Sequence, residues 1–385
     1  MERRLQEVSE ENDSVCADDG RGSGDAIPMV QEGGLDTLSG SRECDADSEG
    51  LYEELDLASF SPRLRARFER QSEEEIRLSR EKRAELEDLL TPGNVIFDRD
   101  MSVEVSMAAS GIAEALVSVC DTAALKDVIR WAVENDVEYS FIGSCSKTIV
   151  RESGVSGLLI RLAEQFDSVE LVSESENEVL ILAGAATSVR KLIGFCVEKG
   201  FFGLEDLLLY EGTVGGCVSS DVSLSNGDKI SKSVVETTII NKEQRELTIK
   251  NKQADSDLRV KIPSTSCITK VLFKMSKGDI AEIAKRVDEI EKRHAEVASG
   301  STGYIFHVFE DQGRMLAREL VEDSGLRGVR IGKARVSPID ANSIINEGGA
   351  TAKDVRVIMN LIRDRVRQDS GIALATRIRL FGKVE

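Results

Sequence analysis

The sequence predicts an α+β fold from Val95 onward, and three patterns indicate it. Amphipathic helical patterns alternate with short apolar runs that are typical of buried strands. Two strand-like runs, 233–241 and 246–251, are separated by a short polar turn, which predicts a β-hairpin. From Lys277 to the end, helical patterns and strands alternate in a stretch long enough for a compact α+β unit.

The first part of this region is expected to contain two helices and several strands. Apolar residues recur at helical spacing over 123–135 and again over 188–199. Gly200 follows the second helix, and glycine is the residue that most often ends one. Short buried strands are expected over 137–142, 158–162, 169–172 and 179–185.

The last part repeats these signals. A strand is expected over 267–275, and Asp279 can cap the helix that follows it. A further strand is expected over 304–309. The run Thr351–Asp354 is a variant of the capping box and predicts the start of another helix, which Gly371 follows. The chain is expected to close with a strand over 378–381.

Residues 1–60 are predicted to be a disordered acidic tail. They are rich in Glu, Asp, Ser and Gly, and cannot bury enough apolar surface to offset the entropy of ordering. They carry −13 of the net charge of −19, which leaves an ordinary −6 for the rest of the chain. The acidic-hydrophobic run 51–57 fits either a docking segment for a protein partner or an inert spacer. A highly charged helix over 63–90, ended by Pro92-Gly93, follows the tail.

Composition argues against several functional classes. An acidic chain repels polyphosphate, so we expect no nucleic-acid binding. No apolar run approaches the about 18 residues needed to span a membrane, and the N-terminus has no apolar signal region. The seven scattered cysteines form no CxxC pair and the chain has two histidines, which argues against a zinc site. We therefore expect a cytoplasmic protein with reduced thiols, no metal and no membrane span.

The glycine-rich run Glu211–Gly216 is the most informative short motif. Glycine loses more backbone freedom on folding than any other residue, so a cluster of glycines needs a compensating role. One role is a tight turn with positive φ. Another is a loop in which the backbone approaches a ligand and its N–H groups form a nest for a phosphate or pyrophosphate. The run by itself leaves both interpretations open.

Further motifs follow one another in a fixed order. They are the loop Ile142–Lys147 with Val150–Arg161 after it, Gly203–Glu205 leading to the glycine run, and the C-terminal succession Leu320–Gly328, Ile331–Ser337, Ala341–Asn346 and Gly349–Val355. This order resembles the UDP-N-acetylenolpyruvoylglucosamine reductase family of peptidoglycan precursor synthesis. The resemblance covers residues 95–385 and favours the ligand-loop interpretation of the glycine run.

The resemblance implies a two-subdomain FAD-binding region of the PCMH (vanillyl-alcohol-oxidase-like) type and a C-terminal α+β substrate domain. We expect these domains over 93–165, 166–275 and 276–385, after the tail (1–60) and the charged helix (61–92). It also implies FAD, reduced by NADPH, that passes a hydride to the enolpyruvyl double bond of a nucleotide sugar. The residues expected to bind the cofactor are Gly143, Ser144, Cys145, Ser146, Lys147, Gly212, Thr213, Val214, Gly215 and Gly216.

At the catalytic positions the sequence departs from the family. The family's Gly-Ser-x-Phe motif, whose serine donates the proton, matches Gly303–Phe306, so Tyr304 stands in place of the acid. Tyrosine can donate a proton, with an ordinary pKa of ~10; an aromatic residue of a strand is the other interpretation. The family's glutamate matches Arg377, a charge reversal that fits a solvated edge residue or a phosphate clamp. Arg259 matches the assisting arginine.

The flavin positions depart as well. Lys147 replaces an asparagine and Glu211 replaces a proline. Lys147 could neutralise a phosphate, whereas Glu211 would repel one unless it points outward. Asp221 replaces another asparagine, and Ala108 and Ser110-Gly111 stand where the family has an arginine and two glycines.

Three hypotheses therefore remain. In the first, the chain is a divergent flavin reductase whose acid chemistry is rearranged. In the second, it is a non-catalytic family member kept as a binding or scaffold protein. In the third, it binds another nucleotide or nucleotide sugar without a flavin. The visible spectrum of the protein and a Tyr304→Phe variant separate them.

Overall fold

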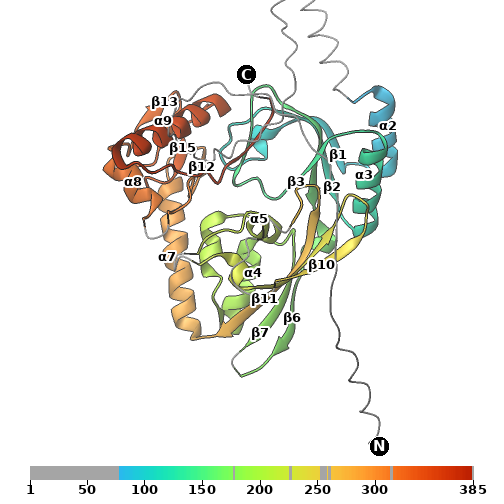
Figure 1. The fold of residues 1–385 in the computed structure, drawn as a ribbon, viewed down its shortest axis with the longest axis horizontal. Coiled ribbons are helices and arrows are strands. Elements are labelled where there is room, and N and C mark those ends of the chain that lie inside the picture. The colour runs from blue at the N-terminus through green and yellow to red at the C-terminus, as the bar shows by residue number, and fades with distance from the viewer. Residues whose placement is uncertain are drawn as a thin grey trace, which may run out of the picture. The chain divides into compact units, whose positions relative to one another are not determined.

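Three larger β-sheets, one two-stranded sheet and the helices around them form the described part of the chain (Figure 1). This computed structural model describes residues 78–176, 178–224, 228–251, 258, 262–312 and 315–383. They all belong to one unit that spans 60–385. The predicted acidic tail, most of the predicted helix over 63–90 and the candidate Arg259 lie outside the described residues.

The first sheet has the strand order β1-β2-β5-β3. β2 pairs antiparallel with β1 and parallel with β5, and β5 pairs parallel with β3. The strands are β1 (Val95–Asp100), β2 (Ile112–Val119), β3 (Tyr139–Ile142) and β5 (Val155–Leu162). The strands predicted over 137–142 and 158–162 are confirmed, and β1 and β2 extend the sheet beyond what the sequence indicated.

Two helices pack on one face of this sheet, α2 (Arg80–Leu89) and α3 (Thr122–Glu134). α3 confirms the helix predicted over 123–135, and the side chain of Asp121 caps its first turn. Side chains alternate between the two faces of a strand. Ala115 and Val117 of β2 therefore pack with the helices, whereas Leu116 belongs to the core on the other face.

The second sheet has the order β10-β9-β11-β7-β6, with the short β8 paired to β11. All of its pairs are antiparallel. The strands are β6 (Val169–Glu174), β7 (Val179–Gly184), β8 (Phe201–Phe202), β9 (Val234–Ile240), β10 (Glu246–Lys250) and β11 (Cys267–Lys277). The predicted hairpin is β9-β10, and the strands predicted over 169–172, 179–185 and 267–275 are confirmed.

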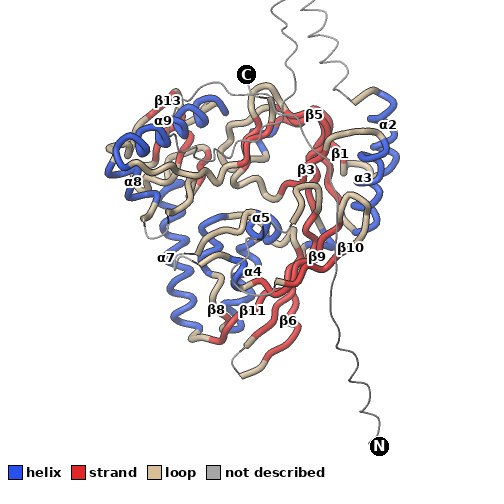
Figure 2. The backbone as a smooth tube through the Cα atoms, in the orientation of Figure 1, coloured by secondary structure: helices blue, strands red, loops and turns tan. Residues whose placement is uncertain are grey.

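Three helices accompany the second sheet (Figure 2). They are α4 (Val189–Lys199), α5 (Val214–Ser219) and α7 (Ile280–Ala298). α4 ends at Gly200, which has φ +70° as predicted for a helix-ending glycine, and Asp279 caps α7. In the described residues, four 3-10 helices connect the elements: η2 (Met101–Val103), η3 (Glu164–Phe166), η4 (Glu205–Tyr210) and η5 (Ile230–Lys232).

The third sheet is antiparallel with the order β12-β15-β14-β13. Its strands are β12 (Gly303–Ile305), β13 (Arg330–Ile331), β14 (Ala334–Val336) and β15 (Ile344–Asn346), and its helices are α8 (Ala317–Asp323) and α9 (Ala352–Ser370). The capping box is confirmed, because Thr351 and Asp354 each bond the other's backbone N–H. Gly371 ends α9 with φ +74°.

The strand predicted over 304–309 is wrong in its second half. β12 ends at Ile305, and the backbone leaves the extended conformation at His307, which has φ +50°. A left-handed residue cannot continue a strand. Phe306 before this residue and Phe309 after it are both buried, so the apolar run reflects core packing rather than a longer strand.

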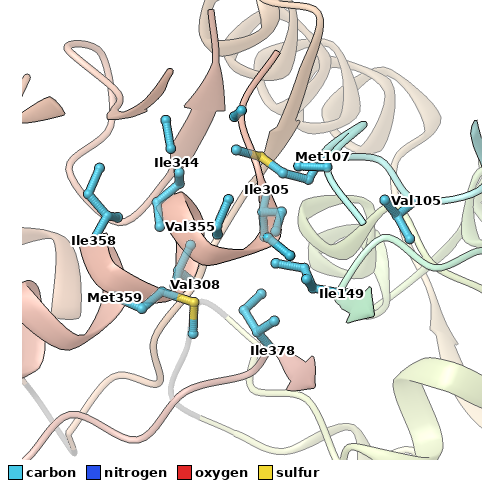
Figure 3. Packing of buried hydrophobic residues seen from close by; sticks show 14 of the residues in the cluster. Val105, Met107, Ile149, Ile305, Val308, Ile344, Val355, Ile358, Met359 and Ile378 are labelled. Atoms are coloured by element: carbon cyan, nitrogen blue, oxygen red, sulfur yellow. The ribbon is translucent and has the colours of Figure 1, made fainter. Parts of the chain in front are cut away.

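The last strand ties the C-terminal segment to the first half of the chain. β16 (Arg379–Phe381), predicted over 378–381, pairs in parallel with β4 (Thr148–Val150). A buried cluster spans the same junction (Figure 3). Figure 3 shows Val105, Met107 and Ile149 from the first half beside Ile305, Val308, Ile344, Val355, Ile358, Met359 and Ile378.

The side chain of Asn346 also forms hydrogen bonds across this junction, and we expect an Asn346→Asp variant to weaken this contact. The side chain is 1% exposed, and its Nδ2 donates to Met107 O at 3.0 Å and Ala108 O at 3.4 Å. The Asp side chain has the same shape as Asn, but its carboxylate oxygen has no proton to donate to these two carbonyl oxygens. The free energy of unfolding at pH 8 should fall by about 3 kcal/mol, measured by urea unfolding. A fall below about 0.5 kcal/mol, as at an ordinary surface site, would contradict this role.

Within the described part, no helix has both the length and the apolar character needed to cross a membrane. The cytoplasmic location inferred from composition stays a prediction, as do the three domain boundaries and the protein partner of the tail.

Candidate active site

The two loops named as cofactor-binding from the sequence lie against each other. The loop 143–147 follows β3, and the loop 211–216 leads into α5. A Cβ at Gly143 would lie 2.5 Å from Thr213 Oγ1, so only glycine allows this approach. Ser144 Oγ also donates to Glu211 O at 3.2 Å. The fold therefore brings together two loops that are distant in the sequence.

The first loop offers a run of four consecutive free backbone donors. The N–H groups of residues 144–147 donate to none of the described residues, and Cys145 has φ +58°. Successive N–H groups around a left-handed residue form a nest that suits an anion. In the second loop, by contrast, the N–H groups of Val214, Gly215 and Gly216 already donate to Thr187 O, Ala185 O and Thr213 Oγ1.

Gly215 serves close packing. A Cβ there would lie 2.9 Å from Ala185 Cβ and 3.1 Å from Ala185 O. The residue thus lets the start of α5 sit directly on the segment that follows β7. This contact fixes the position of the glycine run relative to the second sheet.

Tyr304, the candidate acid, meets Glu211 of the glycine run. Its hydroxyl donates to Glu211 Oε1 at 2.6 Å, across 93 positions of sequence. Nδ1 of His294, a buried residue of α7, lies 3.1 Å from the same oxygen, although its orientation does not complete a hydrogen bond. Burial, and after it the carboxylate of Glu211, raises the pKa of Tyr304 well above its ordinary value. The proton is therefore held on Tyr304.

Glu211 is neither outward-pointing nor free. Burial would raise the pKa of its carboxyl, but His294 and the Tyr304 hydroxyl outweigh burial and lower it. The residue has φ +47°, a value that a proline ring cannot adopt. The backbone at this position therefore differs from the one that the proline of the resembling family would impose.

Lys147 and Arg377 approach one aromatic ring. Lys147 Nζ lies 5.8 Å and Arg377 Cζ lies 5.2 Å from the centroid of Tyr210. Burial, and after it the charge of Arg377, lowers the pKa of Lys147 to about 7. Glu211, Cys217 and Asp340 oppose this shift. Arg377 is half-buried rather than fully solvated.

This pKa predicts how stability depends on pH. In the unfolded chain lysine keeps a pKa of ~10.4, so between pH 7 and 10 the unfolded state binds more protons at this site. Below pH 7 the buried charge of Lys147 lowers the free energy of unfolding by its full amount. This loss becomes smaller as the pH rises toward 10. Lys147→Met should therefore be more stable than wild type at pH 6.5, with a gap that shrinks by pH 9.5. Urea unfolding in phosphate-free buffer measures it, and a gap that does not change with pH would exclude the shifted lysine.

Several other residues at positions that differ from the family pattern stabilise the local structure. Asp221 is 1% exposed, and its carboxylate accepts from the N–H groups of Ser231 and Leu258. Ser110 Oγ accepts from the Val150 N–H at 2.7 Å. A Cβ on Gly111 would lie 2.0 Å from Arg151 O, so glycine is required there. These positions hold loops in place and need no role in chemistry.

The cysteines beside the loops behave as small buried fillers, Cys145 in the turn after β3 and Cys217 within α5. Burial raises the pKa of the Cys145 thiol and raises that of Cys217 to about 12. The five cysteines of the described residues are all unpaired.

His307 is not a surface polar group. It is half-buried, its ring stacks on Phe306 with centroids 5.0 Å apart, and burial holds its pKa well below the usual range. His294 is a site residue that sequence reasoning missed. The signal was its position four residues after Ile290, which places a polar side chain on the apolar face of α7.

Comparisons with known proteins find relatives of both parts of this fold. A sequence profile described as FAD binding domain matches residues 113–246, and one for the C-terminal domain of UDP-N-acetylenolpyruvoylglucosamine reductase matches 294–381. A UDP-N-acetylenolpyruvoylglucosamine reductase of Rickettsia rickettsii (strain Sheila Smith) is 31% identical over 248 residues, covering 63% of this chain and 80% of that protein. The chain belongs to the UDP-N-acetylenolpyruvoylglucosamine reductase family.

Further members of the family extend the match. The reductase of Clostridium kluyveri (strain NBRC 12016) is 27% identical over 305 residues, covering 77% of this chain and 96% of that one. The crystal structure of the reductase from Thermus caldophilus superposes with a TM-score of 0.59 over 75% of this chain and 98% of its own, at 22% identity. The predicted fold, an FAD-binding region followed by the family's C-terminal domain, is confirmed.

Proposed function

We propose that this chain is an FAD-dependent reductase that saturates the enolpyruvyl group of UDP-N-acetylenolpyruvoylglucosamine with NADPH as the reductant. One observation supports this most. The loops 143–147 and 211–216 meet each other, and Tyr304 of the C-terminal sheet bonds directly to the second of them. The cofactor loops, the candidate acid Tyr304 and the cations Lys147 and Arg377 therefore lie in one region of the fold.

The residues present fit FAD. Gly143 lets its loop lie directly against Thr213 of the other loop, and the N–H groups of residues 144–147 have no partner among the described residues. Ser144, Ser146 and Lys147 would hold the cofactor from one loop, and Gly212 and Thr213 from the other. When bound, FAD supplies the hydride chemistry that no amino-acid side chain provides.

The chain's own side chains then handle charge and protons. Hydride addition leaves a carbanion beside the substrate carboxylate, and the Tyr304 hydroxyl donates its proton to that carbon. Glu211 accepts from the hydroxyl and holds it in place, and His294 lies beside Glu211. The resulting tyrosinate takes a proton from water. Lys147 and Arg377 supply positive charge that stabilises the enolate-like species.

The second candidate is a non-catalytic binding protein, and one observation favours it. The Tyr304 hydroxyl already bonds to a carboxylate at 2.6 Å, and the family's glutamate position carries the cation Arg377. In this alternative the bond between Tyr304 and Glu211 only ties the C-terminal sheet to the glycine run.

A turnover assay separates the two. Purified protein with FAD is mixed with NADPH and UDP-N-acetylenolpyruvoylglucosamine, and NADPH absorbance is followed. The proposal predicts substrate-dependent NADPH loss and a product heavier by two hydrogen atoms. NADPH loss equal to the substrate-free background, in protein that retains FAD, would instead assign the non-catalytic role.

A further inference from the structure

His294 is a buried histidine whose ring makes no hydrogen bond within the described part of the chain. It shares the buried face of α7 with Ile283 and Val297. It is 5% exposed, and neither ring nitrogen has a hydrogen-bond partner there. The great majority of buried polar side-chain atoms in proteins have such a partner, and an exception calls for an explanation such as a role in chemistry. Packing alone does not explain a histidine at this position.

The surrounding rings hold His294 close to Glu211. Its ring stacks on Phe306, with the centroids 4.2 Å and the planes 19° apart. It meets the ring of Tyr304 edge to face, with the centroids 6.3 Å apart. Nδ1 of His294 then lies 3.1 Å from Oε1 of Glu211. The nitrogen is within hydrogen-bond distance, so a small rotation of the ring completes the bond.

The same oxygen of Glu211 accepts the proton of Tyr304. The Tyr304 hydroxyl donates to Glu211 Oε1 at 2.6 Å, and no other donor among the described residues completes a hydrogen bond to this carboxylate. A phenol has one proton to donate. Tyr304 therefore cannot keep its bond to Glu211 and protonate a substrate at the same time.

We propose that His294 is a positioning residue that replaces Tyr304 as the hydrogen-bond donor to Glu211 when Tyr304 turns its proton toward the substrate. In that step the Tyr304 O–H bond breaks and a C–H bond forms at the substrate carbanion. His294 directs its Nδ1–H at Glu211 and keeps its own proton. The inference rests on the proposed reductase function and adds to it the residue that releases the acid.

The exchange of donors keeps a partly buried carboxylate satisfied. His294 and the Tyr304 hydroxyl lower the pKa of Glu211 against the effect of burial. A carboxylate that loses its donor in such a site is destabilised, and this cost would add to the barrier of the proton transfer. The Nδ1–H dipole of His294 also reduces the repulsion between Glu211 and the tyrosinate that forms beside it.

NMR of the imidazole protons tests the exchange of donors without flavin or substrate. The chain has two histidines, and a His294→Phe variant identifies the signals of His294 by their loss. In Tyr304→Phe the hydroxyl is gone, so His294 should become the donor to Glu211. We expect its Nδ1–H signal to move downfield and to exchange more slowly with water than in the wild type.

Tyr139→Phe is the control for this comparison. It removes a hydroxyl that donates to Thr265 O, and it should leave the signals of His294 unchanged. A His294 ring that carries its proton on Nε2 and leaves Nδ1 bare, both in the wild type and in Tyr304→Phe, would overturn the inference.

Two substitutions at His294 separate the donor from the ring. His294→Phe keeps a ring against Phe306 and removes the Nδ1–H group. His294→Asn loses the ring but places an amide N–H group near the position of Nδ1. Transfer to the enolpyruvyl substrate should slow at least about tenfold in His294→Phe, because Tyr304 leaves Glu211 less readily. His294→Asn should restore most of the rate, and reduction of bound FAD by NADPH should stay unchanged in both.

The order of the two variants distinguishes positioning from packing. If the ring of His294 only fills space against Phe306, His294→Asn leaves a gap and becomes the more damaging substitution. That order, or a wild-type rate of transfer in His294→Phe, would overturn the inference and leave the proposed function intact. A wild type without substrate-dependent turnover would overturn the proposed function, and with it the role of His294 in that reaction. The NMR comparison would still test the exchange of donors at Glu211.

Discussion

A Tyr304→Phe variant should lose at least about a hundredfold in kcat, the lower range for removal of a general acid. The loss should be confined to one half of the reaction. Reduction of bound FAD by NADPH needs no proton from Tyr304, so its rate should stay near that of the wild type. Transfer to the enolpyruvyl substrate should slow, because the carbanion has lost its proton donor. Stopped-flow absorbance of the flavin measures the two halves separately.

Tyr139→Phe is the matched control. Tyr139 is a half-buried tyrosine that belongs to neither loop, and its hydroxyl donates to Thr265 O at 3.2 Å. It should keep wild-type rates in both halves. If Tyr304→Phe turned over within about threefold of the wild type, Tyr304 would be only a tie between β12 and Glu211.

A Gly215→Val variant should lose FAD. The new Cβ would lie 2.9 Å from Ala185 Cβ and 3.1 Å from Ala185 O, so the start of α5 must move away from the second sheet. The glycine run would then lose its contact with Gly143. We expect FAD affinity to fall at least a hundredfold, and the free energy of unfolding to fall by about 2 kcal/mol as in other overpacked sites. Flavin fluorescence quenching and urea unfolding measure the two effects.

Gly194→Ala provides the control for the glycine substitution. Gly194 lies on the exposed face of α4, and a Cβ there meets nothing within 4 Å. Alanine in a helix is favoured over glycine by about 1 kcal/mol. This variant should bind FAD as the wild type does and unfold at slightly higher urea. Normal FAD affinity in Gly215→Val would show that the loop tolerates displacement.

Local signals were enough to predict many elements. The helix α9 has a capping box at one end and a glycine at the other, and α4 has the same kind of glycine stop. These signals lie within a few residues of the helix ends, so they act without tertiary context. The family fold followed from the order of such local motifs along the chain.

β2 escaped prediction for a physical reason. Glu114 interrupts its apolar pattern with a charge, yet the residue is 6% exposed. Its carboxylate accepts from the N–H groups of Leu78 and Gly157, which come from distant segments. A single sequence does not show that a buried carboxylate will find such partners.

The site was predictable as a set of positions but not as a set of contacts. Tyr304, Glu211 and Lys147 were singled out because they replace family residues of another type. Their pairing was not visible, because Tyr304 and Glu211 meet across 93 positions of sequence. His294 joins them only because α7 turns that face toward β12.

The visible absorption spectrum of the purified protein tests most directly whether the two loops hold FAD. The account predicts a flavin spectrum with close to one FAD per chain, released as intact FAD when the protein is denatured. A colourless protein that also fails to take up added FAD would contradict it, and would leave a family fold that serves binding without flavin chemistry.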